Sequence, residues 1–384
     1  MARKISKKTK KKIVKAAKKY PVFTAVVILL VVVIVGCCLL HSYGYIHIPF
    51  LDGVIPPISS SDDSSDSSGG DIITDDLSIH FLQLGNSSPG DSTLIKTGTT
   101  EILIDAGSTK GSAETIVPYI QQYCTDGILE YVITTHADTD HIAAFIGTTT
   151  YDGVLESFIC QTIIDNKSVA TTQMYADYVA LRDAEVAAGA KHYTAIDCWN
   201  NKNGAQRSFT IAEDITLNIL YQKYYEEYTS NENDNSVCVM ISQGTNHYLF
   251  TGDLETAGET SLVERNTLPK CKLYKAGHHG SDTSSNIALL QKIQPEIVAV
   301  NCCSGGKHNF PTQPFIDRIA VYTDKVYVTT VTAENANNYL PMNGNIVVSS
   351  NGGAVTVNCS NNNILLKDTE WFAQNRTCPE QWET

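Results

Sequence analysis

The sequence predicts an α/β fold in which two β-sheets pack together and helices cover their outer faces. Two blocks of the chain, at about 77–188 and 208–330, each begin with short apolar strands and continue with strands that alternate with helices. No fixed-period repeat of the solenoid kind is present. At 384 residues, the chain is long enough for two average domains or one large one.

The amino-terminal end has the features of a membrane anchor. Residues 1–20 include ten Lys or Arg and no acid, and an apolar run of nineteen residues follows at 22–40. This length matches a bilayer-spanning helix, and the basic flank predicts that Met1 is cytoplasmic. A cleaved signal peptide normally has a shorter apolar region, and residues 34–37 only loosely resemble a lipoprotein cleavage site. We favour an uncleaved, single-pass signal anchor at 21–41 in a bacterial cytoplasmic membrane, with the remainder of the protein extracytoplasmic.

Residues 42–76 are expected to form a linker after the basic tail and the anchor. The segment contains two prolines and is then mostly Ser, Asp and Gly, so it cannot bury enough apolar surface to fold. The folded domain is therefore expected at 77–357. The Asn-rich stretch after it and the remaining tail are expected to form a C-terminal extension at 358–384.

Charge and cysteine content narrow the classes of protein to consider. Apart from the ten basic residues of the tail, 18 Lys or Arg remain against 41 Asp or Glu. Binding to long duplexes draws on cationic contacts with phosphates, so an ectodomain this acidic is a poor duplex binder. The eleven cysteines include no Cys-x-x-Cys, which argues against a Cys-rich zinc finger. Cys359 and Cys378 are candidate disulfide partners.

The first block opens with three apolar segments separated by glycine-containing turns, which is typical of an antiparallel meander. The expected strands are 78–83, 92–96 and 101–105. A helix at about 112–123 precedes an apolar strand that ends at Ile133. Apolar residues at helical spacing predict another helix at about 171–188.

The second block begins near Ser208 and is again rich in strands at first. Its expected strands start near 208 and continue at 215–220, 237–241, 248–251, 297–300 and 326–330. Its expected helices are 259–265, 285–293 and 314–321. These two blocks together are the basis for the prediction of two packed sheets.

A dense group of potential metal ligands follows the strand that ends at Ile133. His136, Asp138, Asp140 and His141 lie within six residues, and imidazole and carboxylate groups suit zinc and other divalent ions. His136 and Asp138 share one parity, whereas Asp140 and His141 are adjacent and point in different directions. One ion cannot easily take all four ligands, so the spacing indicates two ions side by side. The alternative is a polar loop in which Asp140 caps the following helix.

Two later strand ends favour the metal site. The apolar strand at 248–251 ends in Gly252-Asp253, and His278 and His279 lie between glycines after the apolar segment that begins at Lys272. Glycine permits the tight backbone that such loops need. A rigid sheet edge can gather ligands from distant parts of the sequence in this way.

These motifs together resemble the metallo-β-lactamase superfamily, and more narrowly the hydrolase domain of ComEC-type competence proteins and their stand-alone relatives. The motifs are Asp105-Ala-Gly107, His136-x-Asp138-x-Asp140-His141, Glu232-Asn-Asp-Asn235-Ser236, Gly252-Asp253 and Gly277-His-His-Gly-Ser281. The resemblance covers roughly residues 77–357. It implies a four-layer αββα sandwich with the metal ions at the edge of the two sheets.

The resemblance and the number of candidate ligands imply how two divalent ions would be held. Zn²⁺ is the preferred candidate metal, and Mn²⁺ is the alternative. The expected ligands are His136, Asp138, Asp140, His141, Asp253 and His279. The first two would hold one ion, Asp253 would bridge, and the others would hold the second. Phosphocholine-esterase members of the superfamily look similar in using a tandem His pair, so His279 is expected as the ligand and His278 as the substrate-facing group. The first ion is then short of a protein ligand.

The chain departs from the family pattern in three places. The loop at 85–91 is longer than the family's compact Gly-x-Gly-Asp turn. Phe310-Pro311 stands where relatives tend to have a His-Pro pair, so His308 is the candidate for that role. Ala143-Ala144 stands where relatives often have two glycines.

The expected function is that of a membrane-anchored, metal-dependent hydrolase that cleaves phosphodiester bonds with an activated water. Asp140 is expected to orient that water, and His278 or His308 to assist the leaving oxygen. Ser281 and Asn235 are expected to contact the substrate. Competence-type relatives imply nucleic acid as the substrate, whereas the acidic charge favours a small or single-stranded molecule or an envelope phosphodiester. β-Lactam hydrolysis is disfavoured because an Asp replaces the usual second His.

A surface module that keeps its metal site but has lost turnover is the alternative. Phe310 in the loop near the site and the missing ligand of the first ion both motivate it. Turnover of a phosphodiester substrate separates the two hypotheses.

Overall fold

The computed structural model describes residues 76–227, 229–302, 309–332 and 338–383. These residues belong to one compact unit, Ile72–Thr384, which is described by itself. The predicted tail, the predicted anchor and nearly all of the predicted linker lie outside the described residues, as does His308. Among the residues that the structure does describe, no helix is long and apolar enough to span a bilayer.

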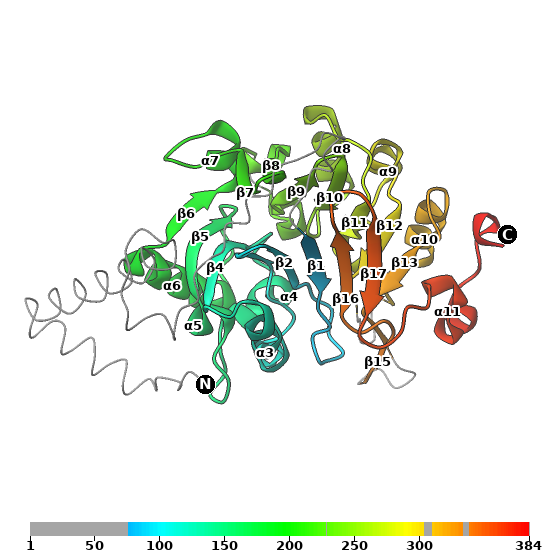
Figure 1. Cartoon of the computed structure of the whole chain (residues 1–384), viewed down its shortest axis with the longest axis horizontal. Helices are drawn as coiled ribbons and strands as arrows, with labels where there is room; N and C mark the ends of the chain where they lie inside the picture. Colours follow the sequence, from blue (N-terminus) through cyan, green and yellow to red (C-terminus); the bar gives the residue numbers. More distant parts are fainter. Residues whose placement is uncertain (1–75, 228, 303–308, 333–337, 384) are drawn as a thin grey trace, which may run out of the picture. The chain divides into compact units, whose positions relative to one another are not determined.

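A first large sheet is built from strands at both ends of the unit (Figure 1). Its strands are β1 (Leu77–Phe81), β2 (Thr93–Thr97), β3 (Thr100–Ile104), β4 (Ile128–Ile133), β5 (Ile159–Asp165), β6 (Lys191–Thr194), β16 (Ile346–Ser350) and β17 (Val355–Cys359). Within the described ranges their order is β17-β16-β1-β2-β3-β4-β5-β6. β1, β2 and β3 pair antiparallel, which confirms the predicted meander.

A second large sheet comes from the middle of the chain. Its strands are β7 (Ser208–Ala212), β8 (Ile215–Leu220), β9 (Cys238–Gln243), β10 (Asn246–Phe250), β11 (Leu273–Lys275), β12 (Ile297–Val300) and β13 (Val326–Val328). Their order in the described part of the chain is β13-β12-β11-β10-β9-β8-β7. A small separate hairpin joins β14 (Thr330–Thr332) to β15 (Tyr339–Pro341).

Helices cover the outer faces of both sheets. They are α3 (Ala113–Tyr123), α4 (Thr139–Ile142), α5 (Val154–Ser157), α6 (Gln173–Ala188), α8 (Thr256–Arg265), α9 (Ile287–Ile293), α10 (Gln313–Ala320) and α11 (Glu370–Asn375). The helix α7 (Ala195–Asn200) differs, because its Ala195 and Cys198 belong to the core between the two sheets. Side chains of α3 and α6 share a buried cluster with the outer face of the first sheet. Side chains of α8, α9 and α10 share another with the outer face of the second sheet.

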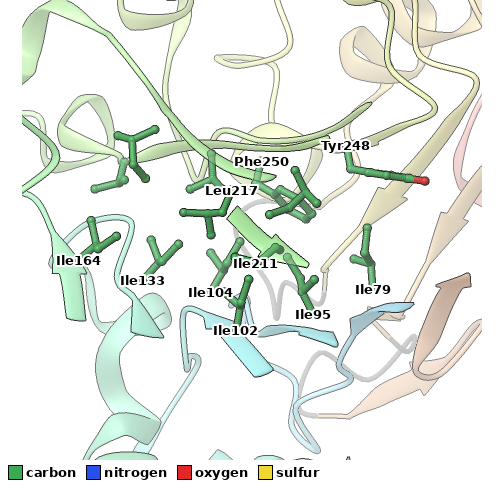
Figure 2. Close-up of a cluster of buried hydrophobic side chains, with 14 of the residues drawn as sticks. Ile79, Ile95, Ile102, Ile104, Ile133, Ile164, Ile211, Leu217, Tyr248 and Phe250 are labelled. Atoms are coloured by element: carbon green, nitrogen blue, oxygen red, sulfur yellow. The ribbon is translucent and has the colours of Figure 1, made fainter. Parts of the chain in front are cut away.

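The largest core lies between the two sheets, where mostly aliphatic side chains from both meet (Figure 2). Alternation along each strand divides its residues between layers. In β3, Ile102 and Ile104 face this inner core while Leu103 faces the helices. In β10, Phe250 faces inward and Leu249 outward. The prediction of two packed sheets with helices outside is therefore confirmed.

Local sequence signals set several helix boundaries close to where they were predicted. α6 begins after Thr172, whose hydroxyl accepts a hydrogen bond from the Tyr175 amide, and it ends at Gly189 with φ of 121°. α10 begins after Thr312, whose hydroxyl accepts from the Phe315 amide, and has a proline in its first turn. Such caps satisfy amides that have no partner within the helix.

Other elements were not predicted. β5, β6 and α7 are absent from the expected elements, and so is β16, which pairs antiparallel with β1 across more than 250 residues of sequence. β17 runs across the expected domain boundary at residue 357. Beyond it, Leu366, Phe372 and Trp382 are buried in the outer core of the second sheet. Cys359 and Cys378, which were candidate disulfide partners, are both free thiols.

The strand directions bring the functional loops together. β3, β4, β5 and β6 run parallel to one another, and so do β10, β11, β12 and β13. Carboxyl ends of parallel strands lie at one edge of a sheet. The residues that follow β3, β4, β10 and β11 are therefore delivered to the same region of the molecule.

Candidate metal centre

Four histidine and aspartate side chains converge at the edge of the two sheets. Asp140 and His141 come from the loop and short helix after β4, Asp253 follows β10, and His279 lies in the turn Gly277–Gly280 after β11. One ligand atom from each lies within 4.8 Å of the others. His141, Asp253 and His279 are at most 1% exposed. The structure thus brings together four of the six predicted ligands in one cluster.

Close contacts within this cluster centre on one carboxylate. Asp253 Oδ2 lies 3.1 Å from His141 Nε2 and 3.2 Å from His279 Nε2. His279 Nε2 is also 3.5 Å from Asp140 Oδ2. Asp253 is therefore the residue around which the imidazoles are arranged.

Several buried atoms of the centre make no hydrogen bond. They are the Nε2 atoms of His136, His141 and His279 and the Oδ1 atom of Asp253. A buried polar atom without a partner costs about 1–3 kcal/mol, so native proteins rarely leave one unexplained. Imidazole nitrogen and carboxylate oxygen are donors that divalent metals accept. The donor set therefore fits a divalent metal ion.

Hydrogen bonds on the far side of each ring orient the two histidines. His141 Nδ1 lies 2.8 Å from Asp105 Oδ2, and Asp105 in turn accepts from the backbone amide and hydroxyl of Thr135, each at 2.7 Å. His279 Nδ1 donates to the carbonyl of Asn301 at 3.0 Å. Each ring therefore carries its proton on Nδ1 and presents the Nε2 lone pair to the cluster, which is how metal-binding imidazoles are usually supported.

A buried ion pair behind His279 was not found by sequence reasoning. Lys275 Nζ lies 2.5 Å from Asp91 Oδ2, and Asp91 Oδ1 lies 3.2 Å from His279 Nδ1. Burial lowers the pKa of Lys275, but Asp91 more than compensates and raises it above its usual value. The signal was a lysine in an apolar strand, two residues before Gly277, and an aspartate directly after Gly90.

The charges of the centre favour a cation. Burial would raise the pKa of Asp253, but the neighbouring histidines hold it well below its usual value. Burial would lower the pKa of His141 and His279, but Asp253 and the other carboxylates raise it well above the usual value. Burial would likewise raise the pKa of Asp140, but His279 and His141 lower it below its usual value. Excess carboxylate charge at this place attracts protons or metal ions.

Backbone geometry at two of the turns is unusual. Gly252 has φ of 56°, and a Cβ there would come within 2.8 Å of the Thr135 side chain, so only glycine fits. His278 and His279 also have positive φ, at 48° and 53°. Non-glycine residues rarely adopt this conformation, and it is found preferentially at functional sites.

The two remaining predicted ligands lie beside the cluster. His136 Nε2 is 3.6 Å from Asp138 Oδ2, and the Asp138 side chain is 48% exposed. Hydroxyls of Thr135 and Ser236 approach His136 Nδ1 at 3.0 and 3.4 Å. Within the described residues, no group of three donors that could hold an ion includes this pair.

His278 is placed differently from its neighbour. Its side chain is 21% exposed, its Nδ1 lies 3.0 Å from Thr283 Oγ1, and its Nε2 lies 3.8 Å from Asp253 Oδ2. Burial lowers its pKa, and the nearby carboxylates only partly oppose this. The Phe310 ring packs beside both histidines, with centroid distances of 5.8 Å to His278 and 6.0 Å to His279.

The two predicted substrate contacts are both buried. Ser281 is 4% exposed, and its hydroxyl lies 3.1 Å from Thr283 Oγ1. Asn235 is 1% exposed and donates to the Glu232 carboxylate, which also accepts from the Ala137 amide in the ligand loop. These bonds connect Asn235 to the loop that carries His136. Substrate contact by either residue stays a prediction.

Comparison with known proteins agrees with the fold and the site. Residues 85–147 match the family described as the metallo-beta-lactamase superfamily. Recombination protein 2 of Haemophilus influenzae is 29% identical over 111 residues, which are 29% of this chain and 14% of that protein. Competence protein ComA of Neisseria gonorrhoeae is 25% identical over 247 residues, which are 64% of this chain and 30% of that protein.

Two packed sheets with candidate histidine and aspartate ligands at their edge, together with this match, indicate a metallo-β-lactamase-like fold. Residues 85–147 match that superfamily, and the relatives of this chain include competence and recombination proteins, which confirms the expected likeness to the ComEC type. The matched segments span 30% or less of the length of these relatives.

Solved structures give weaker likenesses. The metallo-beta-lactamase fold protein YhfI from Bacillus subtilis aligns with a TM-score of 0.39 and 11% identity, over 69% of this chain and 99% of that one. A long-form RNase Z from yeast aligns with a TM-score of 0.40 and 11% identity, over 77% of this chain and 45% of that one.

Proposed function

We propose that this protein is a metal-dependent hydrolase that cleaves phosphodiester bonds. The observation that carries the proposal is the group of buried imidazole and carboxylate atoms that have no hydrogen-bond partner, arranged around Asp253. A divalent ion bound there supplies Lewis-acid chemistry, since it makes water nucleophilic at neutral pH and polarises phosphoryl oxygens.

Each residue of the centre has a proposed task. Asp140, His141, Asp253 and His279 would hold one ion, and His136 with Asp138 would help to hold a second. Zn²⁺ is the first candidate and Mn²⁺ the second.

Asp140 and His278 are the proposed proton-handling groups. The Asp140 side chain is 31% exposed, and its low pKa keeps it ionised, so that it can accept a hydrogen bond from the attacking water. His278 is partly exposed, and burial lowers its pKa, so it is mostly neutral at pH 7. The protonated fraction of His278 would give its Nε2 proton to the leaving oxygen and return to the neutral ring, and such positioned groups contribute about 10²- to 10⁴-fold. His308 remains a second candidate for that task.

The proposed substrate is a phosphodiester that does not require a broad basic surface. The likeness to competence proteins supports nucleic acid, and the excess of 41 acids over 28 basic residues supports a single strand or another small phosphodiester. An envelope polymer with phosphodiester links fits the same chemistry. Ser281 and Asn235 are proposed to contact the substrate.

The test uses the full chain in detergent, loaded with Mn²⁺ or Zn²⁺, and the substrate bis(p-nitrophenyl) phosphate. Turnover above the free-metal rate that is abolished by chelation and by Asp253→Ala supports the proposal. Bound metal without turnover of this substrate, of single-stranded DNA or of a teichoic-acid-type polymer favours a surface module that has lost catalysis. The few donors around His136 and Asp138 are the observation that motivates this second candidate.

We also propose that residues 21–41 anchor the domain outside the cytoplasmic membrane. The support is the ten-residue basic charge of the tail and the nineteen-residue apolar run. The acidic, Ser-rich linker would keep the centre clear of the lipid surface.

A further inference from the structure

We infer that Arg376, from the segment after the last sheet strand, is a positioning residue that holds the loop Asn309–Thr312 against the histidine turn of the metal centre. Through this loop it fixes the Phe310 ring beside His278 and His279. We call this hold of Arg376 on the loop the Arg376 clamp. Its consequence for turnover rests on the proposed function, whereas the clamp itself does not.

The Arg376 guanidinium is bonded to three backbone carbonyls. Its Nη2 donates to Asn309 at 2.5 Å, its Nε donates to Pro311 at 2.8 Å, and its Nη1 donates to Asn375 at 2.6 Å. Two of these carbonyls belong to the loop and flank Phe310. Because the five N–H groups of arginine have a fixed planar geometry, one side chain can hold both carbonyls at a set spacing, which lysine cannot do.

The loop that Arg376 holds packs directly on the turn that carries the two histidines. The backbone amide of Thr312 donates to the Gly280 carbonyl at 2.9 Å, and the Thr312 hydroxyl donates to the same oxygen at 3.2 Å. A Cβ on Gly280 would lie 2.7 Å from Pro311 Cβ, so the two backbones are already in close contact. Phe310 is 5% exposed between this contact and the histidine rings. Displacement of the loop would therefore move the Phe310 ring that packs beside His278 and His279.

The segment that presents Arg376 is itself firmly attached to the second sheet's outer layer. Gln313 and Thr377 exchange two hydrogen bonds, at 2.8 and 2.9 Å, between the start of α10 and the residue after Arg376. Trp382 Nε1 donates to the Thr323 carbonyl at 2.9 Å. The guanidinium also lies over the Trp371 ring, 4.7 Å from its centroid. These anchors give Arg376 a fixed base from which to hold the loop.

Loss of the Arg376 clamp should displace the loop Asn309–Thr312 and leave the candidate metal ligands in place. Asp253 and the bonds of His279 to Asn301 and Asp91 do not depend on Arg376, so metal binding should persist. The Phe310 ring beside His278 should move, and small misplacements of this kind can cost about 10²-fold in rate. The loss should fall on kcat more than on KM, because the group affected is the proposed proton donor.

The experiment compares Arg376→Ala and Arg376→Lys with Arg207→Ala in the full metal-loaded chain. Arg207 is the matched control, since it also donates to a backbone carbonyl, that of Trp199, and lies over that tryptophan's ring at 3.6 Å. The readouts are hydrogen exchange of the 309–316 amides, metal content, kcat and KM with bis(p-nitrophenyl) phosphate, and recovery on adding guanidinium chloride at millimolar concentration.

Arg376→Ala should retain its metal, exchange the Thr312 amide at least about tenfold faster, and lose about 10²-fold in kcat. Guanidinium should restore part of both, Arg376→Lys should recover little, and Arg207→Ala should match the unaltered chain. Unchanged exchange at 309–316 overturns the inference, and so does a general rise in exchange together with loss of metal. If the unaltered chain shows no turnover, the proposed function fails, but the exchange and rescue results still decide the clamp. Should Arg376→Ala not fold, Arg376→Lys carries the same exchange test.

Discussion

Asp253 and His279 lie 3.2 Å apart, Oδ2 to Nε2, although they follow two different strands of the second sheet. β10 and β11 pair in parallel, so the turns that follow them lie side by side. The same carboxylate lies 3.1 Å from His141 Nε2, which comes from the first sheet. Asp253 therefore connects the candidate ligands of the two sheets, and this position makes it the most informative residue to change.

Asp253→Ala should remove the metal and essentially all turnover. The loss of metal affinity should exceed the about 10- to 100-fold that changes to outer partners of a metal ligand cause, a range in which we expect Asp105→Asn. Elemental analysis after dialysis measures the metal content. Asp324→Ala, at a surface ion pair with Lys367, is the control and should keep both properties. Full metal occupancy in Asp253→Ala would contradict the proposed centre.

Alanine substitutions of the adjacent residues His278 and His279 should differ in their effects on metal content and on kcat. His279→Ala should lose a metal ion, because the buried Nε2 of His279 faces the cluster. His278→Ala should keep the metal and lose about 10²- to 10⁴-fold in kcat, as expected of a positioned proton donor. Metal content and steady-state kinetics, measured on the same preparations, distinguish the two. The reverse pattern would exchange the two assignments.

Breaking the buried pair of Asp91 with Lys275 should destabilise the fold strongly. Lys275→Met leaves a buried carboxylate without its partner, which costs about 3–5 kcal/mol in the free energy of unfolding. The double change Asp91→Asn with Lys275→Met should recover much of this loss. Lys272→Met removes a more exposed ion pair with Glu296 and should change stability little. Urea unfolding measures all of these, and equal effects at the buried and exposed pairs would refute the prediction.

His80 should make the fold less stable in mild acid. Burial, helped by Lys96, lowers the pKa of His80 to about 4, from 6.5 in the unfolded chain. Between these values the unfolded state binds more protons, so stability is present above pH 6.5 and is lost as pH falls toward 4. The loss amounts to about 3 kcal/mol.

His80→Gln should remove that part of the pH dependence in urea unfolding curves recorded between pH 4 and 7. Tyr119→Phe, which removes a hydrogen-bond partner of His80 but not the titrating ring, should retain it. Identical pH profiles in His80→Gln and the unaltered chain would show that another group is responsible.

The topology can be tested in intact cells. The basic tail predicts that Met1 is cytoplasmic and His136 is outside, so added protease should release the domain by cutting within 59–75. A chain whose tail lysines and arginine are replaced by Gln or Glu is the matched variant, and its release should fall. Protection of the domain until lysis would show that the orientation is wrong.

Much of the fold and of the metal centre could be predicted from sequence because the signals are local. Strand alternation and helix periodicity record which face of each element is buried, and they located β1 to β4, β7 to β10 and the helices α3, α6 and α10. Asp140, His141, Asp253 and His279 were visible because each follows an apolar strand within a few residues. These patterns depend on neighbours along the chain, so one sequence suffices to read them.

The tertiary structure alone decided what depends on contacts between distant residues. Nothing near Ile346 in sequence indicates that β16 would pair with β1, because strand pairing is set by the whole sheet. Lys275 ends an apolar strand, and only the folded structure shows that Asp91 is its buried partner. Arg376 lay in an apparent appendage, yet it holds the loop beside His278. A charged side chain shows where its partner lies only after the chain has folded, because burial and distance determine the energy of the pair.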